Sequence, residues 1–305
     1  MKKTNTLSTI AAILIASQSL VAQNTITIKA NKATKPLIEK WAEAYSTVRP
    51  DVNIEVVSGM QEANLSLVYS PTNADNITYV GRYALLPITP ANNPILPELT
   101  KHEWKEKELK SLFFVGDEYD DYDQKNKKNK FASQLTIYSG SSKTSASNAF
   151  AAHFGYTQSD IRGKKIAGDD AFLLNAISKD KESVTFSQLT NIYDLQTRTL
   201  RPDIALLPLY AKKGAWQIIE NGTLDDVLRV IDSHPTDLIT IEEFGLSYNS
   251  EPNSITDEFL RWIITDGQSY NNQMGFLALT DREARAQINN IDERTSTSNL
   301  LAQNK

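Results

Sequence analysis

Beyond residue 23, the spacing of apolar residues switches between that of strands and that of helices. TITIKA (25–30) and VNIEVV (52–57) alternate apolar and polar positions and are rich in β-branched residues, which predicts two strands. Thr34 precedes a helical pattern and is predicted to cap it. The apolar residues of that pattern are Leu37, Trp41, Ala44 and Tyr45. A strand–helix–strand unit predicts a parallel sheet and an α/β fold.

Two nearly identical apolar strings, YALLPI (83–88) and IALLPL (204–209), lie about 120 residues apart. One interpretation is that they are two buried strands of similar composition. The other is that they lie side by side and carry the chain into a second domain and back. In that case domain I is discontinuous, made of residues 23–88 and 204–305, and domain II is inserted between them as residues 89–203.

Further elements follow inside and after the proposed insert. QLTIYS (134–139) predicts a strand that leads into a helix at 147–154. The charged block at 117–130 lacks the glycine and glutamate positions of a calcium-binding EF-hand loop, so it is interpreted as a solvated loop. EFLRWIITDGQSYNNQMGFLALT (258–280) begins with an amphipathic helix.

The N-terminus has the pattern of a secretory signal peptide. Lys2 and Lys3 precede a short apolar run, and small residues lead to Ala22. We expect residues 1–22 to be removed, which takes the net charge from −5 to −7 because Lys2 and Lys3 are lost. No second long apolar run follows, so we expect a protein that is not embedded in the membrane after cleavage.

Composition narrows the function classes. A net charge of −5 gives no basic field for nucleic acid, so we expect no nucleic-acid partner. The chain has no cysteine, which excludes disulfides, cysteine–zinc sites and a thiol nucleophile. An exported chain without cysteine is expected in a bacterial periplasm, where its core alone must hold it together.

The sequence offers no recognisable catalytic motif. No HExxH, GxSxG or P-loop string occurs, and the three histidines are far apart. Asp169–Asp170 and Glu242–Glu243 are adjacent carboxylates, and neighbours in sequence point in different directions, so they make poor acid/base pairs. We therefore expect no enzyme, no catalytic residues, no metal site and no cofactor.

SGSSKTSASNAF (139–150) concentrates hydrogen-bond donors where a predicted strand meets a predicted helix. Free backbone N–H groups and the positive end of the helix dipole lie at such a junction, and they bind oxyanions. Lys143 adds charge and three hydroxyls add donors, those of Thr144, Ser145 and Ser147. The alternative is a polar loop that only caps the helix.

A second junction of the same kind precedes the first helix. Lys32, Ala33 and Thr34 stand where the first strand ends. Ligands of open α/β sheets bind at the carboxyl ends of the strands, so the two junctions are expected to face one another across a cleft. One charge-assisted hydrogen bond contributes roughly 1.5–3 kcal/mol, whereas micromolar binding needs about 8 kcal/mol. Two junctions that close together are therefore expected to share one anion.

The mature chain resembles the phosphate-binding, periplasmic substrate-binding proteins of ABC transporters, in a divergent Bacteroidetes-type branch. The resemblance rests on residues 25–59, 80–94, 139–155 and 259–280. It implies an α/β, two-domain periplasmic binding protein of class II, a venus-flytrap with two crossover strands. It also implies a monomer that binds phosphate or another small oxyanion and delivers it to ABC permease subunits.

Carried over by position, the resemblance places the first loop at Ala33–Thr34, followed by Ser58–Gly59 after the second strand, and the second loop at Lys143–Ser147. The family has an arginine before a Ser-Gly-Thr motif in the second loop, and this chain has neither. Lys143 lacks the fork of an arginine. Arg82, before the first crossover strand, either reaches the cleft or forms a salt bridge beside the hinge.

Two functions are therefore open. The first is a periplasmic protein that binds phosphate or a related oxyanion for an ABC importer. The second is a protein-interaction module that kept the fold and lost the small-ligand site. The donor-rich junctions favour the first, and the missing arginine favours the second.

Overall fold

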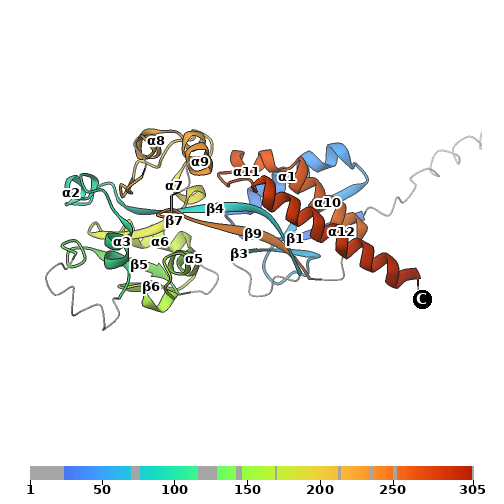
Figure 1. Cartoon of the computed structure of the whole chain (residues 1–305), viewed down its shortest axis with the longest axis horizontal. Coiled ribbons are helices and arrows are strands. Elements are labelled where there is room, and N and C mark those ends of the chain that lie inside the picture. Colours follow the sequence, from blue (N-terminus) through green and yellow to red (C-terminus); the bar gives the residue numbers. More distant parts are fainter. Residues whose placement is uncertain are drawn as a thin grey trace, which may run out of the picture.

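A mixed β-sheet runs through both halves of the molecule (Figure 1). The computed structural model describes residues 24–69, 76–115, 129–141, 146–168, 170–211, 214–233, 236–249 and 253–303, without the side chains of 297–303. In this part of the chain the strand order is β2-β1-β3-β9-β4-β7-β5-β6, and β8 pairs with β4. The predicted signal peptide (1–22) lies outside the described residues, as does most of the charged block at 117–130.

We call lobe I the half of the sheet that contains the first strands of the chain, together with the helices packed on it. These helices come from both ends of the sequence. Its strands are β1 (Asn24–Lys29), β2 (Val52–Val57) and β3 (Leu65–Tyr69). Its helices are α1 (Lys35–Val48), α10 (Ser254–Thr265), α11 (Gln268–Gln273) and α12 (Asp281–Gln303). β1 pairs in parallel with β2 and β3, so the predicted strand–helix–strand unit is confirmed.

α1 shows why these helices gather on lobe I. Its apolar stripe buries Leu37, Ile38, Trp41 and Tyr45. The Trp41 indole N–H donates to the Gly267 carbonyl at 3.1 Å, which ties α1 to the connection between α10 and α11. Tyr45 packs edge-on against Phe259 of α10 at 5.0 Å between ring centroids. Segments more than 200 residues apart therefore share one core.

The other half of the sheet, with its helices, is called lobe II. Its strands are β5 (Thr136–Gly140), β6 (Lys164–Ile166), β7 (Ser183–Gln188) and β8 (Ile204–Leu206). Its helices are α2 (Leu96–Thr100), α3 (Glu106–Phe113), α5 (Ala146–His153), a 3₁₀ turn (Gln158–Asp160), α6 (Ala171–Ile177), α7 (Leu189–Ile192), α8 (Ala215–Asn221) and α9 (Leu224–Ser233). β5 pairs in parallel with β6 and β7.

Two long antiparallel strands connect the lobes. β4 (Ile77–Pro90) pairs with β9 (Thr240–Tyr248) over Ile77–Leu85 and then with β7 over Leu85–Ile88. Figure 1 shows these strands running side by side from one lobe into the other. They are the two crossover strands that the fold class requires.

The echoed strings meet only at their ends. Ile88 of β4 lies opposite Leu206 of β8, so the two strings are neighbours in the sheet. β8 is three residues long and ends at Leu206. The chain returns to lobe I along β9 instead. We therefore propose a second domain boundary near residue 240 as an alternative to the one at 204, and the limits 89–203 stay a prediction.

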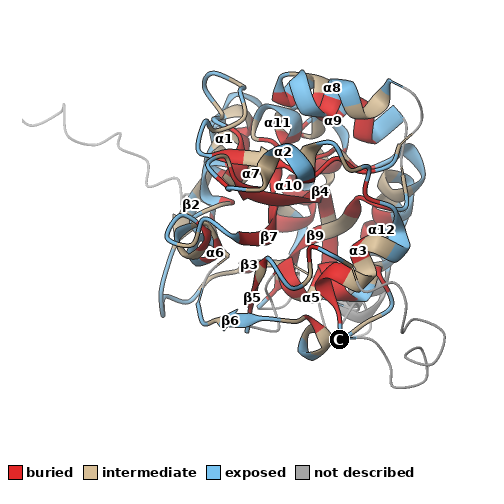
Figure 2. Cartoon of the chain, turned by 90° about the vertical axis from the view of Figure 1, so that its left-hand side faces the viewer, coloured by how far each residue is buried: buried red, intermediate tan, exposed pale blue. Residues whose placement is uncertain are grey.

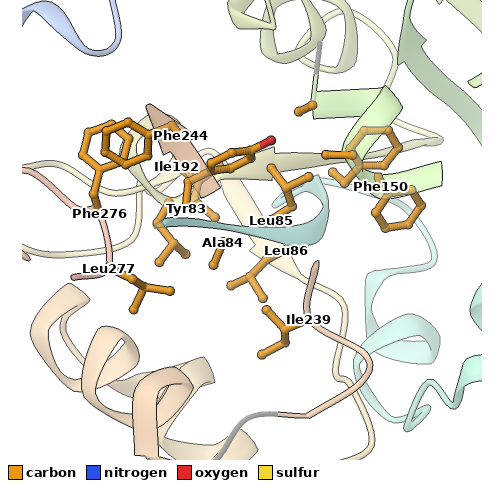
Figure 3. Packing of buried hydrophobic residues seen from close by; sticks show 14 of the residues in the cluster. Tyr83, Ala84, Leu85, Leu86, Phe150, Ile192, Ile239, Phe244, Phe276 and Leu277 are labelled. Atoms are coloured by element: carbon orange, nitrogen blue, oxygen red, sulfur yellow. The ribbon is translucent and has the colours of Figure 1, made fainter. Parts of the chain in front are cut away.

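Buried aromatic and aliphatic side chains fill the space on both sides of the crossover (Figure 3). Tyr83, Leu85 and Leu86 of β4 lie among residues from α5, α7 and β9. In lobe II, Phe150 of α5 stacks on Phe186 of β7 with ring centroids 4.0 Å apart. Figure 2 shows β4, β7 and β9 as mainly buried elements beneath helices with exposed outer faces. Among the described helices, none is both long and apolar enough to cross a membrane.

A glycine in β4 allows the crossover strand to pass beneath α11. The pairing of β4 with β9 is irregular between Tyr79 and Gly81. A Cβ at Gly81 would lie 2.5 Å from Asn271 Nδ2 and 2.7 Å from the Phe244 ring. Both neighbours are buried, so neither has free space to move into.

We expect Gly81→Ala to lower the free energy of unfolding by about 1–3 kcal/mol, the usual cost of overpacking a core. Urea unfolding followed by circular dichroism measures this change. Gly155→Ala is the control, because Gly155 has a φ of +82° and open space around it, so this variant has backbone strain without overpacking. A Gly81→Ala variant as stable as the wild type would contradict the close packing.

Candidate functional site

The first predicted junction is closed by Asn31. Its side-chain Oδ1 accepts hydrogen bonds from the N–H groups of Ala33 and Thr34, each at 3.0 Å, and from Thr34 Oγ1 at 2.9 Å. The Asn31 carbonyl accepts from the Lys35 N–H at 3.0 Å, so the first helical turn begins at Asn31. Thr34 occupies the N-cap position of α1, as expected, but its side chain makes no capping bond, because its hydroxyl donates to Asn31.

Three donors therefore point at one oxygen atom at the start of α1. Thr34 is fully buried, whereas Lys32 is exposed. The convergence of two amides and a hydroxyl on one acceptor is the geometry with which a helix N-terminus holds an oxyanion. Here the acceptor belongs to the chain itself.

Ser58 and Gly59 lie at the same edge of the sheet as this helix start. Lys29 at the end of β1 pairs with Val57 at the end of β2, and the Ala30 N–H donates to the Val57 carbonyl at 3.4 Å. The structure thus brings 58–59 beside 30–34, as expected for carboxyl ends of parallel strands. Ser58 is exposed, and Gly59 has a φ of +68°, which glycine adopts without strain.

The second junction is only partly described. Lys143, Thr144 and Ser145 lie outside the described residues. Ser147 is fully buried, and its Oγ accepts from the Gly140 N–H at 2.6 Å, so this hydroxyl ties the end of β5 to the first turn of α5. The Ala146 N–H at the start of α5 donates to Asp170 Oδ2 at 2.9 Å. A carboxylate of the chain thus binds the amide where an anion was expected.

Lys165 of β6 lies next to this junction and was not predicted. Its Nζ donates to Ser139 Oγ at 3.0 Å and to the carbonyls of Gln158 and Ile161 at 2.7 and 2.8 Å. Burial lowers the pKa of Lys165 from its ordinary value. Its three acceptors match the three donors of an ammonium group, so Lys165 positions the end of β5. Neighbouring residues of a strand point to opposite faces of the sheet. The pair Lys164–Lys165 on a short strand therefore indicates that one of the two lysines faces inward.

Arg82 forms the salt bridge that was one of its two interpretations. Its Nη2 lies 2.6 Å from Asp232 Oδ1, and its Nε donates to the Ala278 carbonyl at 2.8 Å. The same Nε lies 3.4 Å from Glu283 Oε2. The guanidinium is therefore engaged by three protein acceptors beside the crossover strands.

A separate pocket of about 280 Å³ opens in lobe II between the end of β4 and α6. Its lining includes Pro90, Asn92, Leu174 and Asp203, and none of the predicted site residues. It is thus distinct from the two junctions. That the two junctions share one ligand stays a prediction.

The fold can be compared with solved structures. A candidate phosphate ABC transporter substrate-binding protein from Clostridium perfringens, with phosphate bound, matches with a TM-score of 0.55 and 13% identity, over 84% of this chain and 100% of that one. An ABC-type phosphate transport receptor from Vibrio cholerae matches with a TM-score of 0.50 and 11% identity, again over 84% and 100%. No family model and no curated protein matches the sequence. The predicted fold class, a two-domain α/β periplasmic binding protein fold, is confirmed.

Asn31 offers a direct test of the first junction. We expect Asn31→Ala to lower the free energy of unfolding by about 0.5–2 kcal/mol, because three donors at the start of α1 lose their shared acceptor. Thermal unfolding measures this change. Asn53→Ala is the matched control, since Asn53 in β2 bonds only to the neighbouring Glu55 side chain among the contacts that are described. Equal effects of the two substitutions would contradict the role of Asn31.

Glu242 of β9 is expected to make the stability of the folded chain depend on pH. Burial of this half-buried side chain raises its pKa above the ordinary value of 4.5, and His153 opposes the shift. The folded chain therefore binds the proton more tightly than the unfolded chain, so Glu242 lowers stability as the pH rises from 4.5 through its folded pKa.

We expect Glu242→Gln to raise the melting temperature at neutral pH and to leave it unchanged where Glu242 is protonated. Glu62→Gln, on an exposed loop, is the control. Identical pH profiles of Glu242→Gln and wild type would contradict the assignment.

Proposed function

We propose that this protein is an exported binding protein that takes up phosphate or a related small oxyanion between lobes I and II. After loss of its signal peptide it acts in the periplasm as a monomer and passes the anion to the permease subunits of an ABC transporter. The start of α1 and the start of α5 supply the donors. Lys143, Thr144 and Ser145 complete the second set.

One observation carries this proposal: three donors converge on a single oxygen atom at the start of α1. Asn31 Oδ1 takes three donors at α1, and Asp170 Oδ2 takes the Ala146 N–H at α5. Donors that converge on one oxygen atom can hold an oxygen atom of a bound oxyanion in the same place. The shared fold of the two phosphate-related proteins supports the same ligand class.

The arrangement also sets a condition on binding. Asn31 and Asp170 are covalently part of the chain, so an anion must displace at least one of them to use these amides. Asp170 is the stronger competitor, because a carboxylate at a helix N-terminus is stabilised by the dipole. The carboxylate of Asp170 on the Ala146 amide is the specific observation that favours the second candidate, a protein-interaction module with a degenerate ligand site.

Calorimetry with phosphate, sulfate and a polyanion separates the two candidates. We expect micromolar or tighter binding of one oxyanion, and at least tenfold weaker binding for Lys143→Ala because one charge-assisted bond is lost. Lys107→Ala is the control, since Lys107 is an exposed lysine of α3. Heat at the level of buffer dilution for every anion would reject the oxyanion proposal and favour the interaction module.

A further inference from the structure

α9 of lobe II lies against the part of lobe I that joins α11 to α12. Asp225 and Asp232 stand seven residues apart on α9, so their side chains share one face of the helix. Each of them binds an arginine, Arg198 and Arg82 respectively, and both arginines also bond to backbone carbonyls of residues 272–278. We call this set of contacts the α9 brace.

Arg198 forms the first half of the brace. It lies between α7 and β8, and its guanidinium makes two bonds to Asp225, 2.6 Å from Nη2 to Oδ1 and 3.2 Å from Nε to Oδ2. The same group donates to the carbonyls of Asn272 and Gln273, each at 2.8 Å. These carbonyls end α11, where acceptors have no partner within the helix and the dipole favours a cation.

Two backbone hydrogen bonds fix Arg198 in the position from which its side chain reaches lobe I. Its φ is +60°, a left-handed conformation that non-glycine residues seldom adopt. Its carbonyl accepts from the Leu224 N–H at 2.8 Å, and its own N–H donates to the Asp194 carbonyl at 2.8 Å. Arg198 is thereby fixed at the start of α9, and its side chain is directed to lobe I.

Arg82 forms the second half. Its guanidinium joins Asp232 of α9 to the Ala278 carbonyl and to Glu283 of α12. Its backbone exchanges two hydrogen bonds with Leu277, at 2.9 and 2.8 Å. The side chain is only 11% exposed, so water and salt compete poorly for it. Arg82 thus belongs both to a crossover strand and to the brace.

An apolar contact lies between the two arginines. A Cβ placed on Gly275 of lobe I would lie 3.2 Å from Leu195 and Thr190 and 3.4 Å from Leu224. These three side chains come from lobe II. Gly275 has a φ of +80°, so the close approach of the two lobes coincides with a conformation that glycine adopts freely.

From this geometry we infer that the α9 brace is a third connection between the lobes, made by side chains in addition to the pairing of β4 with β9, and that it holds them in the observed orientation. A rotation that moves α9 away from residues 272–283 must break both arginine clusters and the contact at Gly275. A rotation that keeps this face together changes only the opposite face. The brace therefore selects the axis about which the two lobes move.

Distance measurements between spin labels test this inference without any ligand. The chain has no cysteine, so Thr47→Cys on α1 and Lys107→Cys on α3 give one label on each lobe, both at exposed positions. The test variant is Arg198→Asn with Asp232→Asn. Asparagine tolerates a positive φ, and both substitutions remove brace contacts without adding bulk. The control is Arg201→Asn with Asp203→Asn, an exposed pair within lobe II.

We expect one narrow distance population in the wild type and in the control, and a broadened or second population in the test variant. Far-ultraviolet circular dichroism checks that each variant is folded. If the test variant does not fold, Asp225→Asn with Asp232→Asn replaces it, because both carboxylates are exposed and both arginines stay in place. An unchanged distribution in whichever of these variants folds would overturn the inference, as would a wild type that already shows several populations.

Discussion

The antiparallel pairing of β4 with β9 is the interaction on which the two-lobe arrangement depends. Each lobe builds its own parallel strands, and β4 and β9 are the long strands that extend into both. Their backbone groups satisfy one another in a buried environment, where an unpaired N–H or C=O would cost free energy. The same two strands therefore connect the lobes covalently and limit how their ends move relative to each other.

The constraint that helix starts need acceptors explains the candidate site. A helix leaves its first N–H groups without an internal partner, so something must accept from them. At α1 this acceptor is Asn31, and at α5 it is Asp170. An anion-binding protein and a protein without a ligand meet the same requirement, one with a bound anion and the other with its own side chains. This is why donor-rich loops in a sequence are compatible with both functions.

Local patterns could be predicted from the sequence, and long-range choices could not. Alternation and helical spacing predicted β1, α1 and β2, because each pattern lies within a few residues. The N-cap position of α1 was correctly assigned to Thr34, but the acceptor role of Asn31 was missed, since both residue types bond to helix starts and only the geometry decides between them. Residues 204–209 were interpreted either as a second buried strand or as the return strand, because their composition repeats that of 83–88. Strand pairing depends on register, which composition does not reveal.

The same limit applies to side chains whose partners are far away in sequence. Asp170 was noted only as part of a carboxylate pair, whereas its role comes from Ala146, twenty-four residues earlier. The bond from Arg82 to Asp232 spans 150 residues, so the salt-bridge interpretation had no sequence signal to favour it. Residue types at a junction predict what chemistry is available there. Which of those groups remain free for a ligand depends on partners that only the fold supplies.

The brace and the proposed anion site are linked by free energy even though they share no described contact. Binding stabilises a closed arrangement only by as much as the ligand prefers it over the alternatives. If the brace restricts the lobes to few orientations, less conformational entropy is lost when a ligand fixes them. Because Asn31 and Asp170 already bind the helix starts, an anion must spend binding free energy to displace them. A preset orientation of the lobes reduces the conformational entropy that binding must also overcome. Under this inference, restriction at α9 lowers the entropy lost when any guest fixes the two lobes, whether the guest is a small oxyanion or another protein.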